Sequence, residues 1–162
     1  MMKILFIGIL LTLCSFHCSN TNAMDNLLKN MHTLATAGKI DPREIGVILD
    51  IKLKEDKEAS ARQGMKIYTL AGGALLSPYD SVELRIFDAG SRFFLLAYPA
   101  EPVPLQLEEL KKAYTYKGFS AGDKRRDENP GYHFEKNGNT ISFYCDHRLK
   151  QIMLITMEGN TR

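Results

Sequence analysis

Apolar residues recur at helical spacing early in the chain, and the pattern changes to that of strands after Met65. From Asp25 to Gly38 the apolar positions form one stripe, which predicts an amphipathic helix that ends at the glycine. Residues 41–44 read Asp-Pro-Arg-Glu, a capping box with proline at the first helical position, so a second short helix is predicted to close at Leu49. Two helices therefore open the predicted domain.

The remainder alternates apolar and polar residues at strand spacing. A helix that begins at Pro104 divides these strands, and residues 55–64 and 118–131 are predicted to be loops. The class is α+β, an antiparallel sheet meander with two short N-terminal helices and one helix inserted between two β units, because the strands run consecutively. The predicted strands cover residues 50–54, 66–70, 81–87, 92–98, 132–136, 140–146 and 151–157.

Turn length assigns side chains to the two faces of the sheet. A two-residue turn at Asn137-Gly138 places His133 opposite Ser142 on the face away from the core. A three-residue loop over 88–90 in the earlier hairpin groups the side chains differently. The predicted core side of that hairpin holds Val82, Leu84, Ile86, Phe94, Leu96 and Tyr98, and the other side holds Glu83, Arg85, Phe87, Phe93, Leu95 and Ala97.

Two strands, 93–98 and 152–155, lack a polar face. One interpretation is a central strand covered on both sides. The other is an exposed patch with the aromatic, arginine and methionine composition of protein interfaces, and self-association as a homodimer would give the same pattern. The residues predicted to bind a partner are Arg85, Phe87, Phe93, Leu95, Tyr144 and Met153.

The composition is that of a globular protein, and the net charge does not indicate a particular kind of partner. The 162 residues are 44% hydrophobic and 25% charged, which excludes disordered and collagen-like chains, and the formal net charge of +2 gives no reason to expect nucleic acid or an anionic membrane surface. The N-terminus reads as a signal peptide: Lys3, an apolar run from Ile4 to Leu13 too short to span a membrane, and cleavage after Ala23. A single domain over 24–162, periplasmic or secreted, is expected. A lipoprotein acylated at Cys14 is the competing interpretation.

Chemistry-bearing residues are few. After cleavage Cys145 would be the only thiol, and its apolar neighbours predict a buried, unreactive side chain, so the adjacent Asp146 and His147 do not suggest a metal site. No cofactor is expected. Ser142, His133 and Glu135 have the residue types of an acyl-transfer site, but no Gly-x-Ser-x-Gly elbow accompanies them. The sequence 124–126, Lys-Arg-Arg, is flanked by acids that cancel its charge.

The chain contains an approximate internal repeat. A helix, a strand with tyrosine, and a hairpin whose first strand ends in aspartate occur in 24–100 and again in 101–158. Asp88 and Asp146 are the equivalent aspartates of the two halves. With the helix opening Asp41-Pro42-Arg43-Glu44-Ile45, this arrangement resembles the tandem α/β fold of the β-lactamase-inhibitor-protein-like family and its small outer-membrane-assembly relatives. The resemblance implies a non-enzymatic periplasmic or secreted protein that presents one sheet face to a partner.

These observations favour an exported, non-catalytic protein-binding module, such as a periplasmic inhibitor or an immunity protein acting on a toxin or hydrolase. Two alternatives stay open. One is a small envelope hydrolase using His133, Ser142 and Glu135, and the other is an envelope-assembly accessory lipoprotein.

Overall fold

A computed structural model describes residues 25–71, 77–87 and 90–162. The predicted signal peptide and the expected acylation site at Cys14 lie outside these residues. The α+β prediction is confirmed: four helices accompany a nine-stranded antiparallel sheet. Within the described part of the chain, no helix has the length and apolar character needed to cross a membrane.

The sheet consists of two meanders of four consecutive strands joined by their last members. β4 pairs with β9, giving the order β1-β2-β3-β4-β9-β8-β7-β6, and the two-residue β5 (Val103–Pro104) also pairs with β9. The first meander lies in the first half of the predicted repeat and the second meander in the second half. That the two halves are related in sequence stays a prediction. The strands are β1 (Leu53–Glu55), β2 (Lys66–Leu70), β3 (Tyr79–Phe87), β4 (Arg92–Pro99), β6 (Thr115–Ser120), β7 (Gly131–Lys136), β8 (Asn139–Cys145) and β9 (Gln151–Asn160).

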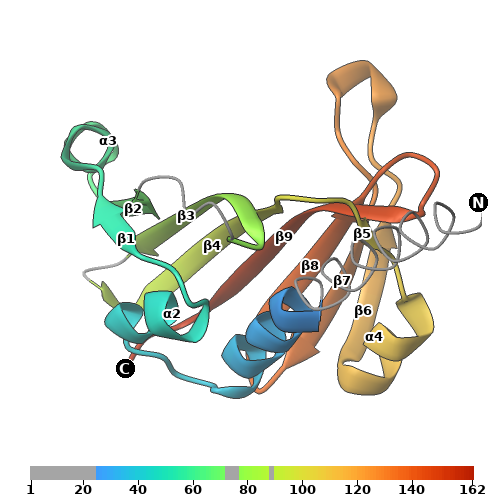
Figure 1. The fold of residues 1–162 in the computed structure, drawn as a ribbon, viewed down its shortest axis with the longest axis horizontal. Helices are drawn as coiled ribbons and strands as arrows, with labels where there is room; N and C mark the ends of the chain where they lie inside the picture. Colours follow the sequence, from blue (N-terminus) through green and yellow to red (C-terminus); the bar gives the residue numbers. More distant parts are fainter. Residues whose placement is uncertain (1–24, 72–76, 88–89) are drawn as a thin grey trace, which may run out of the picture.

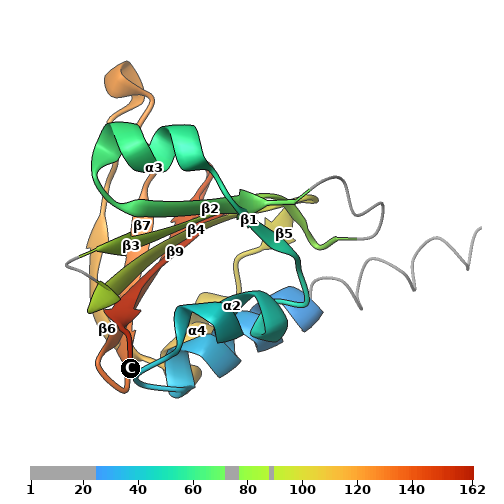
Figure 2. The ribbon, with the colours of Figure 1, turned by 90° about the vertical axis from the view of Figure 1, so that its left-hand side faces the viewer.

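Helices cover the two faces of the sheet unequally. Helix 25–36, α2 (Pro42–Ile48) and α4 (Leu107–Ala113) lie on one side, which we call the inner face (Figures 1 and 2). α3 (Lys57–Gln63) lies on the opposite side, the outer face, where it covers β2 (Figure 2). Most of the outer face is therefore not covered by any helix of the described residues.

Helix 25–36 packs on the sheet through its predicted apolar stripe. Leu27, Met31 and Leu34 are completely or almost completely buried. The helix ends before Gly38, whose φ of +68° suits glycine. Its last carbonyls are capped from the sheet, since the buried amide of Asn139 donates to the carbonyl oxygens of Ala35 (3.2 Å) and Gly38 (3.0 Å).

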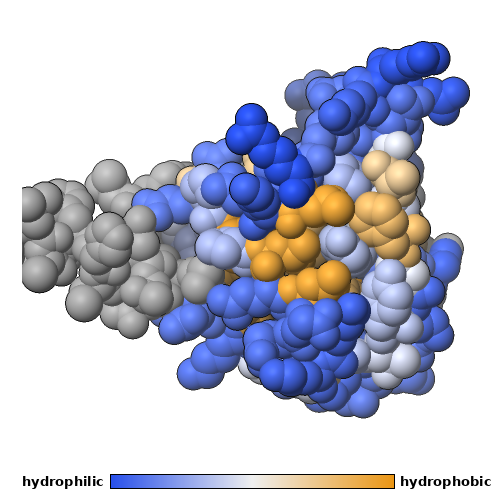
Figure 3. All heavy atoms as spheres, turned by 90° about the vertical axis from the view of Figure 1, so that its right-hand side faces the viewer, coloured by the Kyte–Doolittle hydropathy of each residue, from blue (hydrophilic) through white to orange (hydrophobic). Residues whose placement is uncertain are grey.

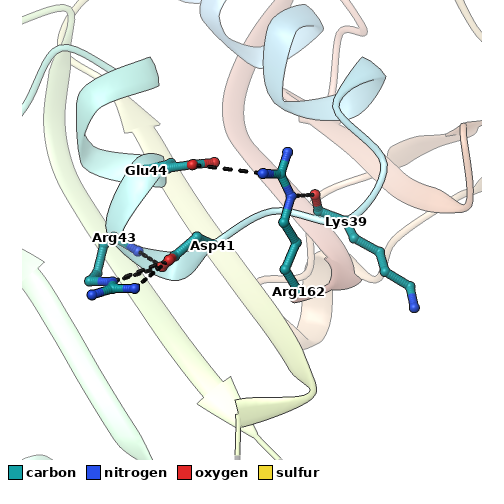
Figure 4. A network of polar contacts seen from close by, with 5 residues as sticks. All are labelled: Lys39, Asp41, Arg43, Glu44 and Arg162. Carbon is teal, nitrogen blue, oxygen red and sulfur yellow. Dashed lines mark hydrogen bonds and ion pairs between the residues drawn. The ribbon is translucent and has the colours of Figure 1, made fainter.

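The start of α2 is the predicted cap. The Asp41 carboxylate accepts a hydrogen bond from the backbone N–H of Arg43 and forms an ion pair with the Arg43 guanidinium at 2.7 Å (Figure 4). Hydrogen bonds from the Arg43 side chain and backbone lower the pKa of Asp41 to about 2. The C-terminal Arg162 donates to the Lys39 carbonyl oxygen at 3.0 Å and lies 3.9 Å from Glu44. The end of β9 is thus tied to the segment between the first two helices.

The register of the β7–β8 hairpin is the predicted one, and that of the β3–β4 hairpin is not. His133 pairs with Ser142, as the two-residue turn requires. In the earlier hairpin Phe87 pairs with Arg92, so four residues, not three, connect the strands. The inner face there carries Val82, Leu84, Ile86, Phe93, Leu95 and Ala97, all buried, and the outer face carries Glu83, Arg85, Phe87, Phe94, Leu96 and Tyr98.

Four further elements differ from the expectation. The inserted helix begins at Leu107, not at Pro104, because Pro104 belongs to β5. Residues 57–63 form α3 where a loop was predicted, because Asp56 caps the Ala59 N–H and Gly64 ends the helix at a φ of +66°. The first predicted strand, 50–54, is displaced to β1 (Leu53–Glu55). β6 occupies part of the predicted long loop, which leaves only residues 121–130 outside strands, with a short 3₁₀ helix at Lys124–Arg126.

Candidate protein-binding site

The outer face is a broad surface with a raised element at each end. α3 rises from the β2 end, and the 121–130 loop rises at the other end between β6 and β7 (Figure 1). One row of paired residues crosses five strands between them. It contains Glu83, Leu96, Thr156, Ser142 and His133.

Four of the six predicted binding residues are accessible here. Arg85 and Phe87 lie on β3 and are half-buried, and Arg85 pairs with Glu83. Tyr144 lies on β8, and Met153 is 45% exposed on β9. Met153 is the extra residue at an irregularity in the β8–β9 pairing, where Tyr144 opposes Leu154 and Cys145 opposes Ile152.

The prediction that Phe93 and Leu95 bind a partner is wrong. Both are completely buried in the inner core, so they cannot form part of an exposed surface. The error follows from the loop length, because one additional residue in a hairpin connection moves every side chain of the second strand to the other face. Their neighbours Phe94, Leu96 and Tyr98 take the outer positions, and Tyr98 is 39% exposed. A connection of four residues, 88–91, is the signal that identifies these outer positions.

A groove of about 710 Å³ lies at the loop end of the outer face. Its walls come from Tyr98 on β4, Tyr144 on β8 and Met153 on β9. Ser120 contributes from β6, and the loop contributes Asp127 and Glu128. We call this site the tyrosine groove.

Gly131 sets the position of the Tyr144 ring. A Cβ atom at Gly131 would lie 2.9 Å from two ring carbons of Tyr144 and 3.2 Å from Ser120 Oγ. The ring therefore lies over the β7 backbone at a place that only glycine leaves open. The Tyr144 ring also meets the His133 ring edge-on at 5.9 Å between centroids.

His133 is held by two hydroxyl groups. Its Nδ1 lies 2.8 Å from Ser142 Oγ, and its Nε2 lies 3.0 Å from Ser120 Oγ. Glu135 does not complete the predicted acyl-transfer set, since its carboxylate pairs with Lys117 at 2.8 Å. Ser142 is 6% exposed, which leaves no approach for a substrate, whereas Ser120 lines the tyrosine groove.

The Cys145 region is a structural turn. Cys145 is completely buried, and burial raises the pKa of its thiol to about 11. The Asp146 carboxylate accepts the backbone N–H groups of Gln151 (3.0 Å) and Lys150 (2.7 Å), and these bonds lower its pKa. No group of His, Cys, Asp and Glu residues arranged to hold a metal ion occurs among the residues that the structure describes.

A second cavity of about 780 Å³ lies near the start of α2 and below α3. Its lining mixes the cations Arg43, Lys57 and Lys66 with the acids Asp41 and Glu55. Arg43 and Asp41 neutralise one another. This cavity therefore favours no particular charge in a ligand.

Comparisons with known protein families, with curated protein sequences and with solved structures found no match to this chain.

Proposed function

We propose that this chain is an exported, non-catalytic protein-binding module that engages another protein through the outer face of its sheet. The observation that carries the proposal is the tyrosine groove. It gathers two tyrosines and a methionine, residue types enriched at interfaces, at the end of the outer face away from α3.

The neighbouring outer-face residues extend this surface. Phe94 and Leu96 of β4 and Phe87 of β3 are only half-buried, although each is an apolar side chain on a strand. The strands beneath them are paired on both sides and backed by the inner core, so the surface is rigid before binding. A rigid surface lowers the conformational cost of association.

The proposed setting outside the cytoplasm is supported by the N-terminal sequence. An exported small protein with a preformed binding face suits an inhibitor or an immunity protein that acts on a toxin or a hydrolase outside the cytoplasm. Lys3 with the apolar run from Ile4 to Leu13 supports the export step.

A serine hydrolase is the second candidate, and the distances around His133 favour it. Ser120 rather than Ser142 would be the nucleophile, because Ser120 lies 3.0 Å from His133 Nε2 and lines the groove. The group at Nδ1 is the neutral hydroxyl of Ser142, which stabilises an imidazolium less than a carboxylate does. Labelling of Ser120 by a fluorophosphonate probe, lost in His133→Ala, would support this candidate over the non-catalytic one.

Photocrosslinking tests the binding proposal. Benzoylphenylalanine replaces Tyr98 in the groove, and in a matched chain it replaces Val47, which is 79% exposed on α2 on the opposite side of the sheet. We expect a discrete protein adduct from the Tyr98 position only, and inhibition or neutralisation of that protein when both are purified. Identical adducts from both positions, or none from either in the native envelope fraction and medium, would overturn the proposal.

A further inference from the structure

The tyrosine groove combines aromatic walls with negatively charged side chains and, in the part of the chain that the structure describes, has no positively charged residue in its lining. The acids come from the 121–130 loop, where Asp127 and Glu128 line the groove. The basic residues of the same loop do not line it, and Arg126 lies 3.7 Å from Asp123 instead. Among the described residues, neither Asp127 nor Glu128 has an ion-pair partner.

Backbone hydrogen bonds hold the loop in this position. Asp123 and Glu128 exchange two of them, from each N–H to the other's carbonyl oxygen, at 3.0 and 2.9 Å. Gly122 has a φ of +68°, and a side chain there would collide with the Glu128 carbonyl and with Pro130. Glu128 is thus presented at the groove by a closed loop.

The opposite wall offers ring faces and a polarisable sulfur. Tyr144 is fixed over Gly131, Tyr98 is 39% exposed, and Met153 is 45% exposed. Figure 3 shows the end of the molecule that carries this loop, where polar side chains lie above and below an exposed hydrophobic patch. A ligand for the groove therefore needs a flat or apolar body together with a positive charge.

From this complementarity we infer that the tyrosine groove binds an arginine side chain presented by the partner protein. A guanidinium is planar, stacks on aromatic faces, remains charged and can donate two parallel hydrogen bonds to one carboxylate. Lysine would supply the charge without the planar stacking. The inference rests on the proposed function, because it identifies the partner chemistry that the same face recognises.

The test uses NMR titration of the isotope-labelled protein with the peptide acetyl-Gly-Arg-Gly-amide. The control peptide carries citrulline, which has the shape of arginine without its charge. We expect saturable, millimolar binding of the arginine peptide that shifts signals of Tyr98, Glu128 and Tyr144, weakens as salt increases, and is absent with citrulline.

Variants locate the contributions. Glu128→Gln should weaken binding of the arginine peptide about threefold, because it removes a charge. Tyr144→Leu should weaken it by about threefold or more, whereas Tyr144→Phe keeps an aromatic ring and should bind the peptide as the wild type does. Glu58→Gln on α3, at the far end of the outer face, is the matched control and should bind normally.

Each outcome decides the inference. Equal shifts with both peptides, shifts elsewhere on the molecule, no shifts, or equal loss in Glu58→Gln would overturn it. If Tyr98 crosslinks a partner but arginine does not bind, the arginine inference fails and the proposed function stands. If arginine binds but no partner is captured, the proposed function fails alone.

Discussion

Cys145 illustrates how burial determines the chemistry of a single residue. The side chain is completely buried, and burial raises its thiol pKa to about 11, so the reactive thiolate is scarce at neutral pH. We predict that iodoacetamide leaves Cys145 unmodified in the native protein at pH 7.5 and modifies it quickly in denaturant. Peptide mass spectrometry of the alkylated protein measures this. Fast native labelling would mean that the β8 end opens readily.

Asn139 is a buried polar residue that links the sheet to the end of helix 25–36. Its buried amide donates to the carbonyl oxygen of Ala35 in the last turn of helix 25–36 and to that of Gly38 just beyond it. We predict that Asn139→Ala lowers the free energy of unfolding by about 2 kcal/mol, because buried carbonyls lose their donor. Urea unfolding followed by circular dichroism measures it.

The control for Asn139 is its neighbour. Thr140 is exposed on the same strand, so Thr140→Val should change the free energy of unfolding by less than about 0.5 kcal/mol. Equal effects of the two substitutions would show that the amide does not act as a cap.

At the scale of elements, the cap of α2 gives a pH-dependent prediction. The Asp41 pKa falls from 3.8 to about 2 in the folded chain, first because of its hydrogen bonds with the Arg43 side chain. A carboxylate with a lowered folded pKa contributes stability above its unfolded pKa, and that contribution disappears as pH falls through the folded value. The window is therefore about pH 4 down to about pH 2.

Asp41→Asn keeps a good cap but removes the titrating charge. We predict that its free energy of unfolding changes less steeply with pH across this window than that of the wild type. Arg43→Ala should flatten the dependence similarly, because it removes the main cause of the lowered pKa. Denaturant midpoints measured from pH 2 to 5 test both, and a slope unchanged in Asp41→Asn would contradict the assignment.

Local signals explain which elements the sequence could predict. In the β7–β8 hairpin, Asn137 and Gly138 both adopt positive φ, a two-residue turn that allows one register, so His133 and Ser142 were paired correctly. The β3–β4 connection carries no such constraint, and a loop of three residues in place of the observed four assigns Phe93 and Leu95 to the wrong face. α3 escaped prediction because none of its residues is buried, leaving no apolar stripe.

The tyrosine groove could be predicted only in part, for a reason of distance along the chain. The composition of the strands predicts Tyr144 and Met153 as binding residues. Tyr98 joins them only because β4 pairs with β9, and Ser120 and Glu128 join them only through β6 and the folding of the 121–130 loop. No local pattern specifies that β4 and β9 are neighbours. The groove is thus a consequence of the tertiary fold.

At the scale of the whole molecule, the join between the two meanders should be its most stable part. β4, β9 and β8 each have a strand on both sides, and their inner faces carry completely buried residues such as Phe93, Phe143 and Ile155. β1 and β6 form the two edges, and no residue of β6 is buried. Opening of an edge strand exposes less apolar surface than opening of the centre.

Native-state hydrogen exchange should therefore rank the strands. We predict the slowest amides in β4, β8 and β9, with free energies of opening close to that of global unfolding, and faster exchange in β1, β6 and α3. Exchange rates are compared with those of the unfolded chain, which removes differences due to sequence. Exchange of β6 as slow as that of β9 would show that the two meanders unfold together and that the edge is stabilised by contacts other than those of the sheet, whereas uniformly fast exchange in β4 would place the weakest point at the join.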